Sequence, residues 1–191
     1  MSKRHSEIIF FVGKNNTGKS ATARKMVLNI YEKYHDIVAF DPQKRFEDIS
    51  DYQIKTYEEM YAFEDFKDTL FIFDDYRLLH SSDKLERGGW LEKLMYYRAE
   101  NRNDFIFICH FPNEILHFLS GYTDYYYVFA SNSLAQDIKN KIQNWRIFSQ
   151  AVECVNSYTE VHGIGEYPIF PHVFVDTNKN KITKINMNNG I

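Results

Sequence analysis

A strand-like run, a glycine-containing loop and a helical segment follow one another near the N-terminus. The run is IIFFV at 8–12, the loop is GKNNTGKS at 13–20, and ATARKMVLNI comes next. The loop matches G-x-x-x-x-G-K-[ST] between the strand and the helix that this pattern requires. Glycines let such a loop wrap closely round an anion, while backbone N–H groups and a helix N-terminus favour negative charge. The sequence therefore predicts a phosphate-binding loop, against the alternative of a glycine turn that matches by chance.

The loop pattern also predicts roles for individual side chains. We expect Lys19 to reach the β- and γ-phosphates of a nucleotide and the Ser20 hydroxyl to bind Mg²⁺. The implied cofactors are ATP and Mg²⁺. The residues predicted to contact the nucleotide are Gly13, Lys14, Asn15, Asn16, Thr17, Gly18, Lys19, Ser20 and Ala21.

Short apolar runs alternate with longer amphipathic segments along the chain. Strands are predicted at 8–12, 37–42, 53–57, 69–76, 105–112 and 125–130, and helices from Gly18 and at 58–67, 91–100, 113–120 and 133–145, the last capped by Ser131 or Ser133. Because the main strands are apolar on both faces, they predict an α/β fold with a mainly parallel sheet flanked by helices on both faces. HVFVDT and KITKIN, separated by NKN, predict a C-terminal β-hairpin that extends the sheet.

Polar residues follow two of the apolar runs. In TLFIFDDY, Asp74 and Asp75 stand at the carboxyl end of the strand, where active groups of open α/β sheets gather. We predict that Asp74 holds Mg²⁺ through water, because Mg²⁺ dehydrates reluctantly. Asp75 occupies the position at which many P-loop ATPases carry a glutamate, so it is predicted to polarise the attacking water. The alternative is that Asp75 is only a turn residue at the strand end. His110, after FIFIC, is predicted to sense the γ-phosphate, with a structural histidine as its alternative.

Composition limits the remaining classes of protein. The 191 residues are 44% hydrophobic, which is enough for one domain. We predict a single domain over 1–191, with a core of about 7–145 and a C-terminal extension, 146–191, that carries the hairpin. The net charge of -3 provides no overall basic field for nucleic acid. Two cysteines suggest a reducing compartment, and no run approaches the roughly 20 apolar residues of a membrane helix. These features predict a cytoplasmic protein, in the host cytoplasm if it is viral.

Four stretches in order, GKNNTGKS, FIFDDY, YYRAENRNDFIFICHFPNEI and TDYYYVFASNS, resemble the FtsK–HerA superfamily of DNA-pumping ATPases. Viral DNA-packaging ATPases are the most similar branch, and Zot-like morphogenesis ATPases are the second choice because they usually carry a membrane segment. The resemblance implies an ASCE-type P-loop ATPase, a homo-oligomeric ring, double-stranded DNA as partner, and a capsid portal. The chain fits a compact viral ATPase or the ATPase domain of a longer protein.

The resemblance also places arginines at the end of the helix before the third strong strand. Arg98 and Arg102 are four residues apart, so on a continuing helix they share a face and can present guanidinium groups to a neighbouring subunit's γ-phosphate. Pairing with Glu100 or Asp104, or exposure to solvent, is the alternative. Arg87 is the reserve candidate.

Small basic clusters are candidate contacts for DNA phosphates. We rank first Lys44, Arg45, Lys84 and Arg87, and below them Lys139, Lys141 and Arg146. Each cluster also fits an ordinary solvated face.

Three functions share the predicted loop. The first is an ATPase motor that translocates double-stranded DNA and packages a viral genome into a capsid. The second is a small-molecule kinase, for which RGGW at 87–90 could be a remnant of a lid. The third is a nucleotide-gated assembly scaffold, which remains open because the family commonly has glutamate at the position of Asp75. If Asp75 is not the catalytic carboxylate, Glu100 and Glu114 are the next candidates.

Overall fold

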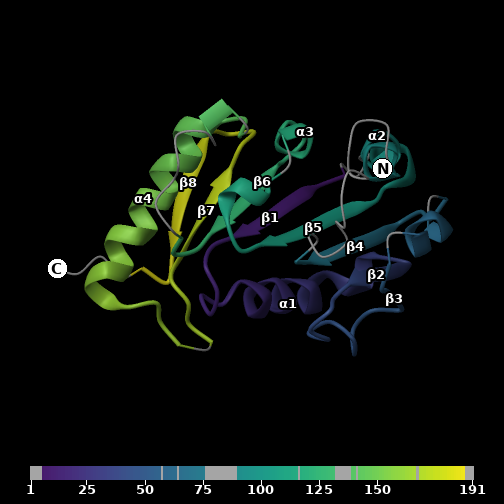
Figure 1. Cartoon of the computed structure of the whole chain (residues 1–191), viewed down its shortest axis with the longest axis horizontal. Coiled ribbons are helices and arrows are strands. Elements are labelled where there is room, and N and C mark those ends of the chain that lie inside the picture. The colour runs from purple at the N-terminus through teal and green to yellow at the C-terminus, as the bar shows by residue number, and fades with distance from the viewer. Residues whose placement is uncertain are drawn as a thin grey trace. The chain divides into compact units, whose positions relative to one another are not determined.

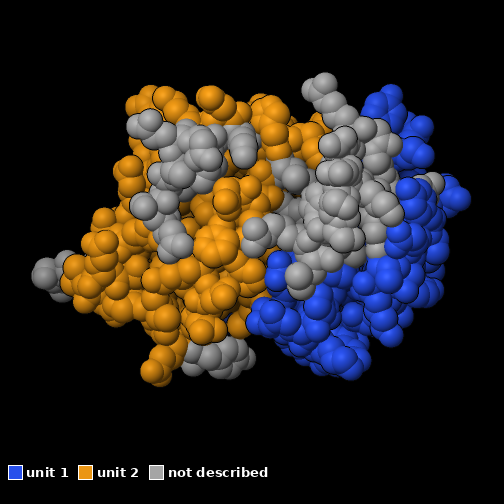
Figure 2. Space-filling view, in the orientation of Figure 1, with its two compact units in different colours: residues 1–7, 24–107 blue, residues 8–23, 108–191 orange. Residues whose placement is uncertain are grey.

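The computed structural model describes residues 6–56, 58–63, 65–75, 90–115, 117–131, 139–140, 142–166 and 168–187, with Trp90 described by its backbone alone. Its strands form a mixed sheet of eight in the order β3-β2-β4-β5-β1-β6-β7-β8 (Figure 1). The chain divides into two compact units, coloured separately in Figure 2. Unit 1 comprises residues 1–7 and 24–107, and unit 2 comprises residues 8–23 and 108–191.

Unit 1 is built on parallel strands. It holds β2 (Asp36–Phe40), β3 (Tyr52–Ile54), β4 (Thr69–Asp74), residues 104–107 of β5 (Asp104–Cys109), α2 (Trp90–Asn101), and the 3-10 helices η1 (Tyr31–Lys33) and η2 (Glu58–Phe63). β2 pairs in parallel with both β3 and β4. Every residue of β4 and β5 is buried, as expected for strands covered on both faces. Phe71 stacks on Phe105 and Phe73 on Phe107, with ring centroids 5.2 and 5.0 Å apart.

Unit 2 carries residues 8–23 and the C-terminal part of the chain from residue 108. It holds β1 (Ile8–Val12), β6 (Tyr125–Val128), β7 (His172–Asp176), β8 (Lys181–Ile185), α4 (Trp145–His162), α3 (His117–Ser120) and the 3-10 helix η4 (Pro112–Glu114). β1 pairs with β6 in parallel, and β6 with β7 and β7 with β8 in antiparallel. Helix α1 (Lys19–Ile30) begins in unit 2 and continues in unit 1 from residue 24.

Helix α4 covers the sheet of unit 2 along β7 and β8 (Figure 1). Its buried residues follow the period of an amphipathic helix and are Ile147, Phe148, Ala151, Val152 and Val155. Phe148 packs edge-on against Tyr126 of β6, with ring centroids 5.0 Å apart. Gly163 ends the helix with φ of +78°, a value that glycine adopts without steric cost, and its N–H donates to the Thr159 carbonyl.

The predicted fold class is confirmed: the sheet is mainly parallel, helices flank it, and β7 and β8 form the C-terminal hairpin. The predicted strands all exist, although most are shorter than expected, as is the helix at α1. Helix α2, expected at 91–100, extends one residue further at each end. Within the described parts of the chain, no helix is both long and apolar enough to cross a membrane.

Three helix predictions need correction. The short helix expected at 113–120 is instead the 3-10 helix η4, Pro112–Glu114, and the four-residue helix α3, His117–Ser120. The helix expected at 58–67 is a 3-10 helix that ends at Phe63. The helix expected at 133–145 lies mostly outside the described residues, and its described part is a 3-10 turn at 139–140 followed by turns at 142–144. Helix α4, which starts only at Trp145, was not predicted.

Candidate functional site

The loop of residues 13–18 joins β1 to α1 and is fixed at both ends within unit 2. The Gly13 N–H donates to the carbonyl of Cys109, 3.2 Å away at the end of β5, and the Lys14 N–H donates to that of Ala130, 2.8 Å away beyond β6. At the other end, the Thr22 N–H donates to the Gly18 carbonyl and closes the first turn of α1. The loop therefore lies where the carboxyl ends of neighbouring strands meet.

The backbone of the loop explains its glycines. Gly18 has φ of +88°, in the left-handed region that side chains disfavour, and Asn16 has φ of +61°. A Cβ at Gly13 would lie 2.7 Å from the Cβ of Phe129, so the position is closed to any larger residue. Both glycines of the pattern are thus required by geometry.

The side chains of the loop converge on one carbonyl. The Thr17 hydroxyl and the Lys19 ammonium both donate to the Lys14 carbonyl, each at 2.8 Å. Lys19 is only 4% exposed, so a positive charge is held inside the loop. Ser20 and Ala21 are half-buried in the first turn of α1, whereas Lys14, Asn15 and Asn16 are exposed. A buried ammonium beside a helix N-terminus is an environment that stabilises an anion.

His110 directly follows the strand end that binds the loop. Its backbone N–H donates to Glu114 Oε2, 2.8 Å away, and its side chain is half-buried. Glu114, a reserve candidate for the catalytic carboxylate, is 5% exposed. The carbonyl of Cys109, the residue before His110, accepts the Gly13 N–H. His110 and Glu114 therefore lie near the start of the loop, within unit 2.

A second group of charged residues lies at the ends of β2 and β4 in unit 1. The parallel register pairs Phe40 with Phe73. Asp41, directly after β2, and Asp74, the last residue of β4, therefore lie at neighbouring strand ends. Asp74 Oδ2 accepts a charged hydrogen bond from Arg45 Nη1 at 3.1 Å, where the Asp74 side chain is 2% exposed and the Arg45 side chain 40%. Arg45, a candidate DNA contact, is therefore held by the candidate metal ligand.

Asp41 was missed by the sequence analysis. It is 5% exposed, and its Oδ2 accepts the Phe46 N–H at 2.6 Å. Its buried Oδ1 has no hydrogen-bond partner among the described residues. The available signal was its place immediately after an apolar strand, which is the same signal that singled out Asp74.

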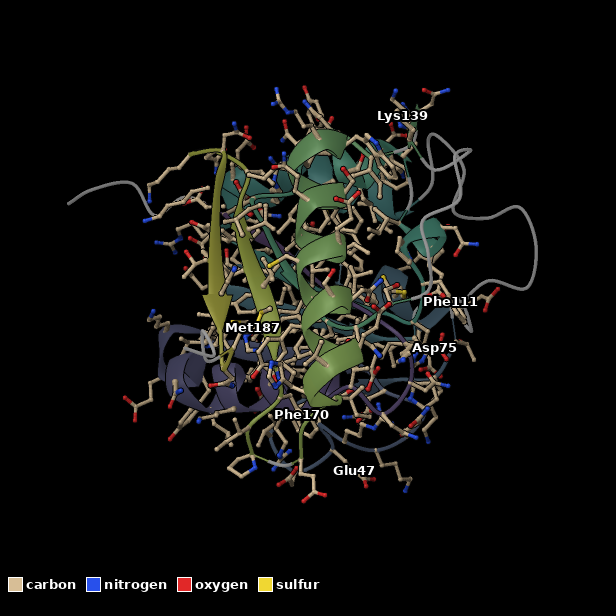
Figure 3. All side chains as sticks on the ribbon, turned by 90° about the vertical axis from the view of Figure 1, so that its left-hand side faces the viewer. Glu47, Asp75, Phe111, Lys139, Phe170 and Met187 are labelled. Carbon is tan, nitrogen blue, oxygen red and sulfur yellow. The ribbon has the colours of Figure 1, made fainter. Side chains whose placement is uncertain are left out.

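Asp75 lies in the turn after β4 rather than in the strand. Its φ of +59° is left-handed, a conformation that aspartate tolerates better than most residues, and its side chain is half-buried. Figure 3 labels its position. The geometry is that of a strand-end turn, so a catalytic role for Asp75 stays a prediction.

The expectation that Arg98 and Arg102 share a helix face was wrong. Helix α2 ends at Asn101, and Arg102 has a left-handed φ of +58°, which takes it off the helix. Arg98 Nη1 donates to the Met95 carbonyl at 2.7 Å, while Arg102 forms an ion pair with Asp68.

The other predicted basic contacts are less defined. Lys44 is exposed and pairs with Glu47 at 3.2 Å. Lys84, Arg87 and Lys141 lie outside the described residues. Lys139 and Arg146 are exposed.

Hard oxygen ligands are present for a magnesium ion. The donors are the Asp74 carboxylate and the Ser20 hydroxyl, which are ligand types that Mg²⁺ prefers. Over the part of the chain that is described, no group of three or more His, Cys, Asp or Glu side chains could hold a metal ion. Each donor is of a chemical type that fits Mg²⁺. Asp74 belongs to unit 1 and Ser20 to unit 2, so the binding of one ion by both stays a prediction.

No protein-family model and no curated protein matches this sequence. The structure, however, is similar to that of the genome packaging NTPase B204 from Sulfolobus turreted icosahedral virus 2 in complex with ATP-gammaS. The TM-score is 0.67 at 12% identity, and the match covers 97% of this chain and 98% of that one.

Two other structures widen the comparison. The N-terminal domain of zonular occludens toxin from Neisseria meningitidis gives a TM-score of 0.50 at 10% identity, covering 73% of this chain and all of that one. The cytoplasmic domain of the Type VII secretion ATPase EccC from Thermomonospora curvata gives a TM-score of 0.62 at 11% identity. That match covers 97% of this chain and 24% of that one. At these identities the likeness shows the fold, an α/β fold shared with P-loop ATPases, and the neighbours include both families suspected from the sequence.

Proposed function

We propose that this protein is a magnesium-dependent ATPase that translocates double-stranded DNA, and that it packages a viral genome. The observation that carries the proposal is the loop between β1 and α1, with its buried Lys19 and its sterically required Gly13 and Gly18. The similarity to a viral packaging NTPase over nearly the full length of both chains supports the DNA-packaging form of this activity.

Each residue of the proposed site has a separate role in ATP binding or hydrolysis. Lys19 and the N–H groups of residues 13–21 bind and orient the phosphates of ATP. Ser20 and Asp74 hold Mg²⁺, which, when bound, neutralises charge that develops on the β- and γ-phosphates. Asp75 orients and polarises the attacking water, with Glu114 as the alternative carboxylate, and His110 senses the γ-phosphate. Because charge stabilisation dominates phosphoryl transfer, loss of Lys19 is the most damaging single change.

The assembly is part of the proposal. We expect a homo-oligomeric ring in the host cytoplasm that engages DNA phosphates through Lys44, Arg45, Lys84 and Arg87 and docks on a capsid portal. An arginine from the neighbouring subunit, Arg98 or Arg102, completes each site. Contacts of this kind bind the backbone and do not select a base sequence.

Phosphate release from ATP, measured with and without linear double-stranded DNA, tests the proposal. We expect Mg²⁺-dependent hydrolysis that double-stranded DNA stimulates. Turnover that requires a small-molecule acceptor would instead identify a kinase, and ATP binding without turnover under any condition would identify a scaffold. Either result refutes the motor.

A further inference from the structure

An aromatic ring from the C-terminal part of the chain lies on the loop of residues 13–18. A Cβ placed on Gly18 would be 2.1 Å from Cγ of Phe170 and 2.2 and 2.7 Å from its two Cδ atoms. The ring of Phe170 therefore covers the Cα of Gly18 directly. Both residues belong to unit 2, and Phe170 lies on the segment between α4 and β7, where Figure 3 labels it.

Phe170 is held in place through its backbone. Its carbonyl accepts hydrogen bonds from Nδ1 of His172 at 2.9 Å and from Nδ2 of Asn186 at 3.1 Å. The His172 ring in turn stacks on the ring of Phe129, with the ring centroids 4.8 Å apart, and Phe129 packs against Gly13. The loop glycines Gly13 and Gly18 are thus both contacted by one cluster of ring-bearing residues, which consists of Phe129, His172 and Phe170.

The segment before Phe170 is also tightly folded. A Cβ at Gly165 would lie 2.5 Å from the Ile169 carbonyl oxygen and 2.8 Å from Cδ of Pro171. The Ile169 N–H donates to the Glu166 carbonyl at 2.7 Å. The ring of Phe170 is therefore positioned by a defined turn.

Phe170 is nevertheless only half-buried. The largest fully buried side chains of the described residues include nine other phenylalanines, which lie on β1, β4, β5, α4 and adjoining loops and are each at most 2% exposed. Phe170 keeps part of its surface exposed to solvent, and the residue beside it, Ile169, is 61% exposed. An anchored, partly exposed aromatic residue that lies on an anion-binding loop is a suitable partner for a planar ligand group.

We propose that Phe170 is the base-binding platform of the nucleotide site, where its ring stacks on the base while the loop binds the phosphates. The inference rests on the proposed nucleotide binding and extends it to the base. Stacking on a phenyl ring uses the π-face that every base has and involves no hydrogen-bond readout. We therefore expect ATP and GTP to bind with similar affinity.

Binding of ATP and of inorganic tripolyphosphate to the full chain, measured by calorimetry, tests this role. Tripolyphosphate shares the phosphates but has no base. We expect Phe170→Ala to weaken ATP binding about 5- to 150-fold and to leave tripolyphosphate binding unchanged. Phe170→Trp, which retains a stacking ring, should keep ATP affinity, and its added fluorescence should respond to ATP and not to tripolyphosphate.

Phe174→Ala is the matched control. Phe174 is also half-buried, but its ring packs on Tyr125 and Tyr127 at 5.4 and 5.1 Å. This variant should bind ATP like the wild type. Unchanged or tighter ATP binding by Phe170→Ala would overturn the inference, and so would an equal loss of ATP and tripolyphosphate, which indicates a support for the loop. If the wild type binds neither ligand, the proposed function itself fails.

Discussion

The ion pair between Arg45 and Asp74 leads to a prediction about the nucleotide-free protein. Arg45→Gln removes the guanidinium and keeps most of the aliphatic stem. The Arg45 backbone carbonyl, which accepts a hydrogen bond from Arg24 Nη1 at 2.7 Å, is not altered. The change therefore acts mainly on the buried Asp74 carboxylate.

The exposure of the two side chains sets the expected loss in the free energy of unfolding. Exposed ion pairs contribute about 0.2–1 kcal/mol, whereas removing one partner of a buried pair costs about 3–5 kcal/mol. The Asp74 side chain is 2% exposed but that of Arg45 is 40% exposed, so solvent screens part of the interaction. We expect Arg45→Gln to lower the free energy of unfolding by about 1–2 kcal/mol, which for a chain of this size is about 2–8 °C in Tm.

The same substitution should also alter the Mg²⁺ requirement of nucleotide binding. If Mg²⁺ and Arg45 compete for Asp74, Arg45→Gln should lower the Mg²⁺ concentration needed for half-maximal nucleotide binding. Urea unfolding in EDTA and titration of Mg²⁺ against a fluorescent ATP analogue measure the two effects.

Glu47→Gln is the control for the loss of a nearby ion pair. It removes the Lys44–Glu47 pair, whose side chains are 72% and 54% exposed, so we expect a change of less than about 0.5 kcal/mol. An Arg45→Gln variant as stable as Glu47→Gln and with an unchanged requirement for Mg²⁺ would refute the reasoning.

Three further predictions concern the carboxylates, pH and the arginines. Asp74→Asn should weaken Mg²⁺-dependent nucleotide binding, whereas Asp75→Asn should leave binding nearly intact and slow phosphate release; normal hydrolysis by Asp75→Asn would shift the catalytic role to Glu114. Burial lowers the pKa of His172 below its ordinary value of 6.5, with a partial opposing effect from the Phe170 carbonyl. The unfolded state therefore binds the proton more readily, and the free energy of unfolding should fall as pH drops below about 6.5, less steeply in His172→Asn. Mixing Lys19→Ala with Arg98→Ala or Arg102→Ala should restore part of the DNA-stimulated hydrolysis if the arginine acts in trans; full activity of an arginine variant alone excludes that residue.

The strands and the loop were predictable because their signals are local. β1, β4 and β5 are continuous apolar runs, and strands covered on both faces have that composition. Helix α4 also carried a local signal, since Ile147, Ala151 and Val155 recur every four residues, but the sequence analysis did not use it. The end of α2 at Asn101 was predicted to within one residue, but its continuation to Arg102 was wrong, because Arg102 adopts a left-handed conformation more typical of glycine or asparagine.

The remaining features depend on contacts between distant residues. Phe170 reaches Gly18 only because α4 and the turn at 163–171 bring the end of the chain back to the loop. The Arg45–Asp74 pair depends on the pairing of β2 with β4. Neither contact leaves a periodic or compositional pattern in the sequence.

The proposed ATP hydrolysis depends on the loop of residues 13–18 and on Lys19. Steady-state phosphate release by Lys19→Ala, measured beside Lys25→Ala, tests this dependence, since Lys25→Ala removes an exposed lysine from the same helix. We expect Lys19→Ala to lower the rate by about a hundredfold or more and Lys25→Ala to hydrolyse ATP like the wild type. ATP turnover by Lys19→Ala at the wild-type rate would refute the proposed role of the loop.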